Sequence, residues 1–141
     1  MKIHHVFLFG AALASIQTGC ASQPLALAQV GPDATCRPLP ISKGRLQVFS
    51  ATEKSIPFAS DDPTFFNLHT GYEIYDAAGN PVKFVMNHAS NMDEWPDTAT
   101  LPPGKYRILA ASTWCGQVSV PVVIEKGKTT VVHLDDNRFP S

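Results

Sequence analysis

Apolar and polar residues alternate near the C-terminal end of the chain, and this pattern constrains the fold more than any other feature. A period of two is typical of a β-strand with one buried face, because successive side chains point to opposite sides of a sheet. Pro121 interrupts the pattern and cannot donate a ladder hydrogen bond, so we expect an edge strand or a bulge there. The positions assigned to the buried face, in GQVSVPVVI (116–124) and after the EKGK turn, are Val118, Val120, Val122, Ile124, Thr130, Val132 and Leu134.

A hairpin is predicted by the segment TGYEIYDAAGNPVKFVMN (70–87). Two runs rich in β-formers flank a reversal at Gly79 and Asn80, residues that tolerate the positive φ of a tight turn. In the second run Val82, Phe84 and Met86 share one face, and we assign this face to the core.

The remaining segments complete an all-β prediction. Alternation also marks GRLQVFSA (44–51), through Leu46 and Val48, and TATLPPGKYRILAAS (98–112), while no segment after the N-terminal leader has a helical period. The 12 prolines and 9 glycines supply many turns. We therefore expect a single Ig-like or transthyretin-like antiparallel β-sandwich of about seven strands.

The first residues have the order of a targeting signal. Lys2 gives a basic start, and the uncharged apolar run from Val6 to Ile16 is too short to cross a bilayer comfortably. We therefore predict export and assign residues 1–19 to a signal peptide. The net charge of −1 excludes the basic footprint of a nucleic-acid binder.

The segment TGCAS (18–22) resembles a bacterial lipobox, in which the signal is cut before a cysteine that then receives lipid. Gly19 fits before Cys20, and Ala21-Ser22 is similar to lipoproteins sent to the outer membrane, whereas Gln17 departs from the usual apolar residue. The resemblance implies an acylated Cys20 and an outer-membrane lipoprotein that faces the periplasm or the cell surface. Residues 20–35 would then form a flexible leash, and residues 36–141 the folded domain.

A rival cleavage site remains open. The small-x-small sequence at 26–28 would release Gln29 as the first residue of a soluble periplasmic or secreted form. Under either cut, Cys36 and Cys115 are the remaining thiols of the mature domain. Because exported proteins sit in an oxidising compartment, we expect these two cysteines to form a disulfide.

The motif LPPGKYRI (101–108), followed by VPVVIEKGKTTVVHLD (120–135), resembles a recurring bacterial surface module. Carboxypeptidase-regulatory-like domains and related transthyretin-like (prealbumin-like) or collagen-adhesin B-type sandwiches carry a similar strand pair, and YEIYDAAGNPV (72–82) is similar to their preceding hairpin. The resemblance covers about residues 71–134. It implies a non-catalytic sandwich that serves as a spacer, adhesion unit or accessory domain.

Three soft or borderline ligands lie close together in KFVMNHASNMDEWPD (83–97). Met86, His88 and Met92 suit copper(I), since thioether sulfur and imidazole are ligands that this ion accepts. The alternative is that Met86 continues the core face of its strand. A periplasmic metal-binding protein is therefore the second functional hypothesis.

The first functional hypothesis is a non-catalytic envelope protein that binds a partner or serves as an accessory, and exposed aromatic residues support it. Trp95 lies in a polar loop beside Asp93 and Glu94, and such rings supply large contact areas at low entropic cost. Trp114 is instead expected to pack on the disulfide or the core. Two isolated histidines complete the candidates: we expect His69 to be packed or hydrogen-bonded in a loop and His133 to face solvent from a strand.

No catalytic motif is readable, and we expect no enzyme activity and no cofactor. The acidic pairs 61–62, 93–94 and 135–136 lack the spacing of a calcium loop and are interpreted as solvated turns. The expected partners are the membrane, through the lipid anchor, and another envelope protein or a glycan.

Overall fold

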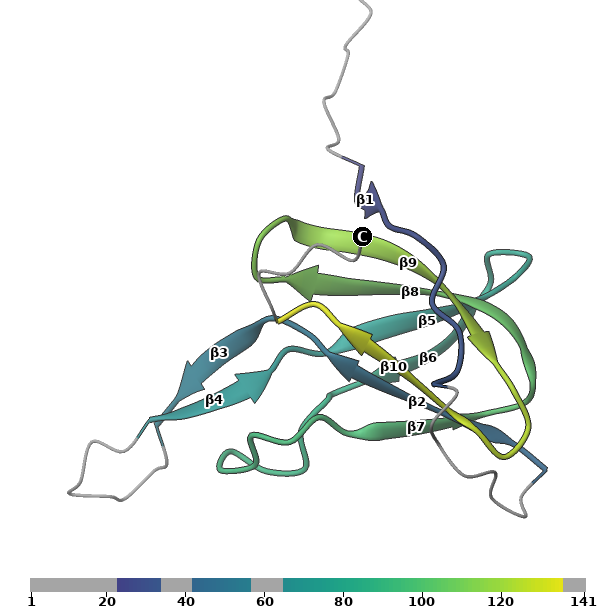
Figure 1. Cartoon of the computed structure of the whole chain (residues 1–141). Coiled ribbons are helices and arrows are strands. Elements are labelled where there is room, and N and C mark those ends of the chain that lie inside the picture. Colours follow the sequence, from purple (N-terminus) through teal and green to yellow (C-terminus); the bar gives the residue numbers. More distant parts are fainter. Residues whose placement is uncertain (1–22, 34–41, 57–64, 136–141) are drawn as a thin grey trace, which may run out of the picture.

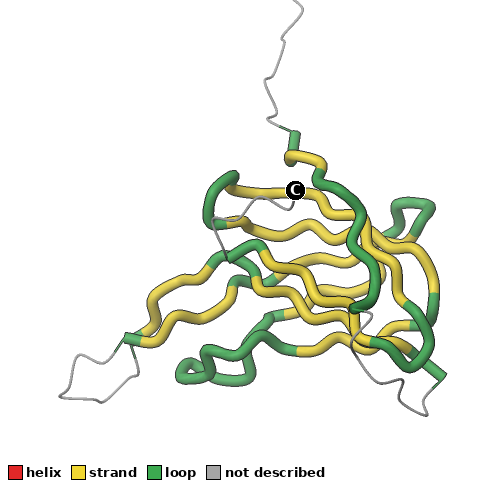
Figure 2. Tube along the Cα trace, in the orientation of Figure 1, coloured by secondary structure: helices red, strands yellow, loops and turns green. Residues whose placement is uncertain are grey.

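β-Strands provide all the regular structure in the described residues, which are 23–33, 42–56 and 65–135 of the computed structural model (Figure 1). Figure 2 shows strands and loops alone along this trace. Within these ranges, no helix has the length and apolarity needed to span a membrane. The strands are β1 (Leu25–Ala26), β2 (Gly44–Phe49), β3 (Thr52–Ser55), β4 (Phe66–His69), β5 (Tyr72–Asp76), β6 (Pro81–Val85), β7 (Thr98–Leu101), β8 (Gly104–Ser112), β9 (Gly116–Ile124) and β10 (Thr129–His133).

The strands form a five-stranded sheet in the order β1-β9-β8-β5-β6, a three-stranded sheet in the order β10-β2-β7, and the hairpin β3-β4. In Figure 1 this hairpin projects from the lower left of the molecule. The all-β prediction is confirmed, and the arrangement is compatible with a β-sandwich. The described residues form ten strands, whereas about seven were expected for the domain.

The expectation of purely antiparallel sheets is wrong, because two pairs are parallel: β1 with β9, and β2 with β10. The cause of the pairing between β2 and β10 is the route of the chain after β9. Strands β9 and β10 belong to different sheets, so the EKGK turn carries the chain across the sandwich rather than back along the same sheet. β10 then runs beside β2 in the same direction, and the first long strand and the last strand of the domain become neighbours.

The core lies between the inner faces of the two larger sheets, as the alternation predicts. Thr130 and all the apolar positions assigned to the buried face in the C-terminal segment are at most 2% exposed, and Leu46 and Val48 are fully buried. The assignments for 44–51 and 116–135 are therefore confirmed. The core residues are Leu46, Val48, Tyr72, Ile74, Val85, Ala99, Leu101, Ile108, Ala110, Val118, Val120, Val122, Ile124, Val132 and Leu134.

The face assigned to the core in β6 is wrong. Val82, Phe84 and Met86 are 46%, 58% and 61% exposed, whereas Val85 is only 4% exposed and lies opposite the buried Tyr72. Strand β6 is the edge strand of its sheet, and its inward face carries Val85 and Lys83. Val85 is buried, whereas Lys83 stays exposed because the sheet ends at this strand. The more apolar face therefore points outward, and the hydrophobic pattern misled the assignment.

In the reversal between β5 and β6, Gly79 has the predicted positive φ, with a value of +87°. Asn80 has a different role, because its backbone N–H and its side-chain amide both donate to the carboxylate of Asp76. The N–H of Ala78 donates to the same carboxylate. The hydrogen bonds from Asn80, together with those from the turn backbone, lower the pKa of Asp76 from its ordinary value of 3.8.

The N-terminal stretch 23–33, predicted to belong to a flexible leash, lies along β9. Leu27 N–H donates to Ser119 O, Val30 N–H to Pro121 O, and Val123 N–H to Val30 O, each at 2.8 Å. From the first bond to the second, the N-terminal stretch advances three residues while β9 advances two. This irregularity falls opposite Pro121 and belongs to the N-terminal stretch. β9 itself is the second strand of its sheet and pairs with β8 through Pro121 without a register shift, so the expected edge strand is not found at this position.

Candidate interaction site

An aromatic cluster gathers where β2 and β10 end, and it brings together three residues that the sequence suggested separately. We call Phe49, His69, Trp95 and His133 the Phe49 cluster. The Phe49 ring stacks on His133 at a centroid distance of 4.5 Å. The edges of His69 and Trp95 meet it in T-shaped contacts at 5.5 and 5.7 Å.

The register of the parallel pair explains the stacking. Phe49 and His133 are Cα partners, and their neighbours Val48 and Val132 both point into the core. Both rings therefore point to the outer face of the three-stranded sheet. The stack is a consequence of pairing between the first long strand and the last strand.

Trp95 is supplied by the loop that joins β6 to β7 (86–97). This loop has no regular structure, but hydrogen bonds hold it at several points. Glu94 Oε1 accepts a hydrogen bond of 2.7 Å from Asn67 N–H on β4. Gln47 Nε2 on β2 donates to Pro96 O at 3.3 Å. Asp93 Oδ1 accepts from Trp95 N–H at 3.1 Å. These contacts fix the backbone on both sides of Trp95.

The start of this loop is fixed by Asn87, which is fully buried and has a φ of +70°. Its side-chain amide donates to Val48 O at 2.8 Å and to Ser50 Oγ at 2.9 Å. Ser50 Oγ in turn donates to Thr70 O at 2.6 Å. One side chain thus joins the ends of β2 and β6 to the connection between β4 and β5.

Trp95 itself stays 65% exposed while its ring contacts Phe49. Asp93 and Glu94, predicted as partner contacts, use their carboxylates to hold the loop. His133 is exposed, as predicted, and His69 is 5% exposed with its Nδ1 2.7 Å from Ser50 O. His69 is therefore hydrogen-bonded as predicted, although it lies on strand β4 rather than in a loop.

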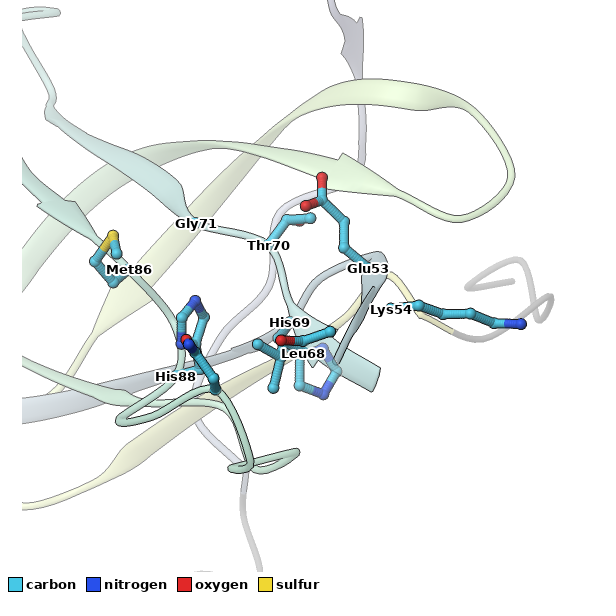
Figure 3. A pocket seen from close by; sticks show the side chains of 10 residues that line it. Glu53, Lys54, Leu68, His69, Thr70, Gly71, Met86 and His88 are labelled. Atoms are coloured by element: carbon cyan, nitrogen blue, oxygen red, sulfur yellow. The ribbon is translucent and has the colours of Figure 1, made fainter. Parts of the chain in front are cut away.

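A cavity of about 320 Å³ lies at the base of the β3–β4 hairpin, close to this loop. Figure 3 shows Met86 and His88 along one wall, with Glu53, Leu68 and His69 among the residues on the other. Met92, the third predicted metal ligand, is 59% exposed and does not line the cavity. In the described part of the chain, no three His, Cys, Asp or Glu side chains are grouped to hold a metal ion.

Some predicted sites fall outside the described residues. Cys20 and Cys36 are both outside them, so lipidation of Cys20 and the Cys36–Cys115 disulfide stay predictions. Cys115 is exposed at the tip of the β8–β9 hairpin, where Gly116 has a φ of +68°, and it forms no disulfide with another described residue. Trp114 is half-buried and lines an apolar pocket beside β9 and β10, while the pair 61–62 and residue 136 are outside the described ranges.

Two residues of the site, Phe49 and Asn87, were missed by sequence reasoning. Phe49 is the last residue of β2, whose inward positions were identified, so its outward direction could be predicted, but the residues around its ring depend on long-range register. The only sequence signal for Asn87 was that asparagine tolerates a positive φ.

Tyr72 is a buried residue of the core. Its burial, with a smaller effect from the charge of Asp97, raises the pKa of the Tyr72 phenol above the ordinary value of 10.0.

Comparison with protein families, with curated proteins and with solved structures gives no match.

Proposed function

We propose that this protein is an exported, lipid-anchored β-sandwich of the bacterial envelope that binds another envelope protein or a glycan through Trp95. It has no catalytic activity of its own. The fold proposed for the sandwich is the Ig-like or transthyretin-like arrangement implied by the motif LPPGKYRI and the strands after it.

The observation that carries the binding role is an exposed indole on a fixed loop. Trp95 is 65% exposed, and Glu94 and Gln47 hold the backbone on both sides of it through contacts to β4 and β2. A ring that is already positioned loses little conformational entropy when a partner covers it. Free, mobile aromatic side chains lack this advantage.

The test is site-specific photocrosslinking in intact cells, with a photoreactive phenylalanine analogue in place of Trp95. Phe84 is the matched control, because it is 58% exposed and lies on the edge strand β6. The proposal expects a discrete adduct from position 95 that is absent from position 84. Equal labelling at both positions, or none at position 95, would contradict it.

The lipid anchor has a test of its own. Cys20→Ala should abolish metabolic labelling with an acyl-chain probe and release the protein from the membrane fraction. Unchanged acyl labelling would refute the assignment. The proposed Cys36–Cys115 disulfide predicts that alkylation without reductant adds no mass to the exported protein.

Metal binding is a second candidate because Met86 and His88 line one cavity together with His69. The Nδ1 atom of His88 is buried and has no hydrogen-bond partner among the described residues. Titration with copper(I) under reducing conditions should show weaker binding for His88→Ala than for Met92→Leu, since Met92 lies outside the cavity lining. Equal binding by both variants and the unaltered protein would remove this candidate.

A further inference from the structure

The N-terminal stretch 23–33 forms an edge of the five-stranded sheet. Without it, β9 would present its outer edge to solvent, because β8 pairs only with the other side of β9. Leu25 and Ala26 pair in parallel with Val118 and Ser119, and hydrogen bonds continue at Leu27 and Val30. Asp33 N–H then donates to Thr129 O at 3.2 Å, which reaches the neighbouring sheet.

The same stretch also covers the opening between the two sheets. Leu27 and Val30 are half-buried and pack against the core. An apolar pocket of about 230 Å³ has Leu27 and Ala28 in its lining, together with the buried Val120, Val132 and Leu134. Loss of Leu27 and Ala28 would therefore remove part of the lining and expose core residues of both sheets to water.

This arrangement bears on where the exported chain is cut. Cleavage after Ala28 would remove β1, Leu27 and part of the pocket lining. Cleavage before Cys20 would keep all of them, because the described stretch begins at Gln23. A folded domain that uses residues 25–28 as a strand and as part of its core lining is compatible only with the upstream cut.

We propose that residues 23–33 are a built-in edge strand of the mature protein, so that the signal is removed upstream of Gln23 and the small-x-small sequence at 26–28 is not used. The inference rests on the export assumed in the proposed function. Figure 1 shows β1 at the upper end of the molecule and the β6–β7 loop, which carries Trp95, at the lower end.

The first test is the intact mass of the full-length gene product purified from cells that export it. An N-terminus at any residue from Cys20 to Gln23 supports the inference, and an N-terminus at Gln29 overturns it. Failure of the lipid anchor is distinguishable, because an N-terminus in this window without an acyl mass would refute lipidation and leave the edge strand intact.

The second test compares two alanine substitutions in the same stretch. Leu27 is half-buried against the core, whereas Leu25 is 48% exposed, and either change keeps the residues at 26 and 28 small. Leu27→Ala should lower the Tm of the purified mature protein by roughly 4–8 °C, and Leu25→Ala by about 1 °C or less. Equal Tm values for both variants and the unaltered protein would overturn the inference, because they would mean that Leu27 takes no part in the mature fold.

Discussion

The loop 86–97 and the strand β6 that precedes it both expose apolar side chains, but they do so in different ways. Strand β6 is regular, and its outward residues Val82 and Phe84 lie on a sheet edge. The exposed Lys83 and the imide nitrogen of Pro81 on the same strand are features that natural proteins use to discourage edge pairing. In contrast, the loop is irregular and yet holds Trp95 through contacts to β2 and β4.

The difference shows that exposure alone does not identify a binding residue. An exposed aromatic ring on a strand edge is common in soluble proteins. An exposed ring whose flanking backbone is held by several hydrogen bonds, and that contacts the ring of Phe49, has the preorganisation expected of an interaction site. Substitutions in the two regions should therefore differ in their effects on stability and on the order of Trp95.

Asn87 stands at the junction of the two regions, and Asn87→Ala should cause the largest loss of stability. The change removes two buried hydrogen bonds and places alanine at a φ of +70°, so we expect the free energy of unfolding to fall by about 3–4 kcal/mol. Chemical denaturation measures this change. Asn87→Gly should cost about 1 kcal/mol less, because glycine relieves the backbone strain. Asn91, exposed in the same loop, is the matched control, and an equal loss for Asn91→Ala would contradict the role of Asn87.

Phe49→Ala should affect the loop more than Phe84→Ala affects β6. Phe49 is half-buried and contacts the rings of His69, Trp95 and His133, so its loss should lower the free energy of unfolding by about 2 kcal/mol. Phe84→Ala should cost about 0.5 kcal/mol or less. Near-ultraviolet circular dichroism should also lose tryptophan signal in the Phe49 variant alone. Similar spectra for the two variants would mean that Phe49 does not order Trp95.

Glu94→Ala should loosen the loop locally with a smaller effect on global stability. It removes the 2.7 Å hydrogen bond to Asn67 N–H, worth about 1 kcal/mol at an exposed site. Amide hydrogen exchange at Asn67 should become faster. Glu94→Gln keeps an acceptor oxygen and should restore much of the protection. An Asn67 amide that exchanges at the same rate in all three proteins would exclude the contact.

The smallest expected effect is on the β5–β6 turn, at the other end of β6. The folded pKa of Asp76 lies below its ordinary value, so the carboxylate contributes stability that is present above about pH 4 and is lost as the pH falls through the folded pKa. Asp76→Asn should therefore lower the Tm slightly at pH 6, and the difference should shrink at pH 3. A difference that grows on acidification would reverse the assigned sign.

Local alternation was enough to predict the all-β class and most of the core. Val118, Val120 and Val122 face inward on a central stretch of β9 where every second residue meets the opposite sheet. On β6 the same reasoning failed, since an edge strand can bury one residue, Val85, and leave its more apolar face outside. The strength of a hydrophobic pattern does not indicate which face is covered when a sheet ends at that strand.

The candidate site was predicted in part, through its exposed residues. Trp95, His69 and His133 were each recognised alone. His133 reaches Phe49 through a parallel pairing that no local pattern encodes, and His69 and Trp95 reach it from β4 and from the β6–β7 loop. The three residues proposed as copper ligands are not together in the structure, because their positions also depend on where strand β6 ends. Met86 and His88 line one cavity because the strand β6 ends there, and the loop then carries Met92 away from it.

The parallel pairing of β2 with β10 also has a consequence for the order of folding. Phe49 and His133 come from early and late strands of the domain, so this pairing closes a long stretch of the chain, from β2 to β10, into one loop. Such non-local contacts slow folding, because the entropy of closing the loop is lost before the contacts form. A chain that leaves the ribosome N-terminus first cannot complete the three-stranded sheet until β10 has emerged. The domain therefore stays incompletely folded for most of its own synthesis.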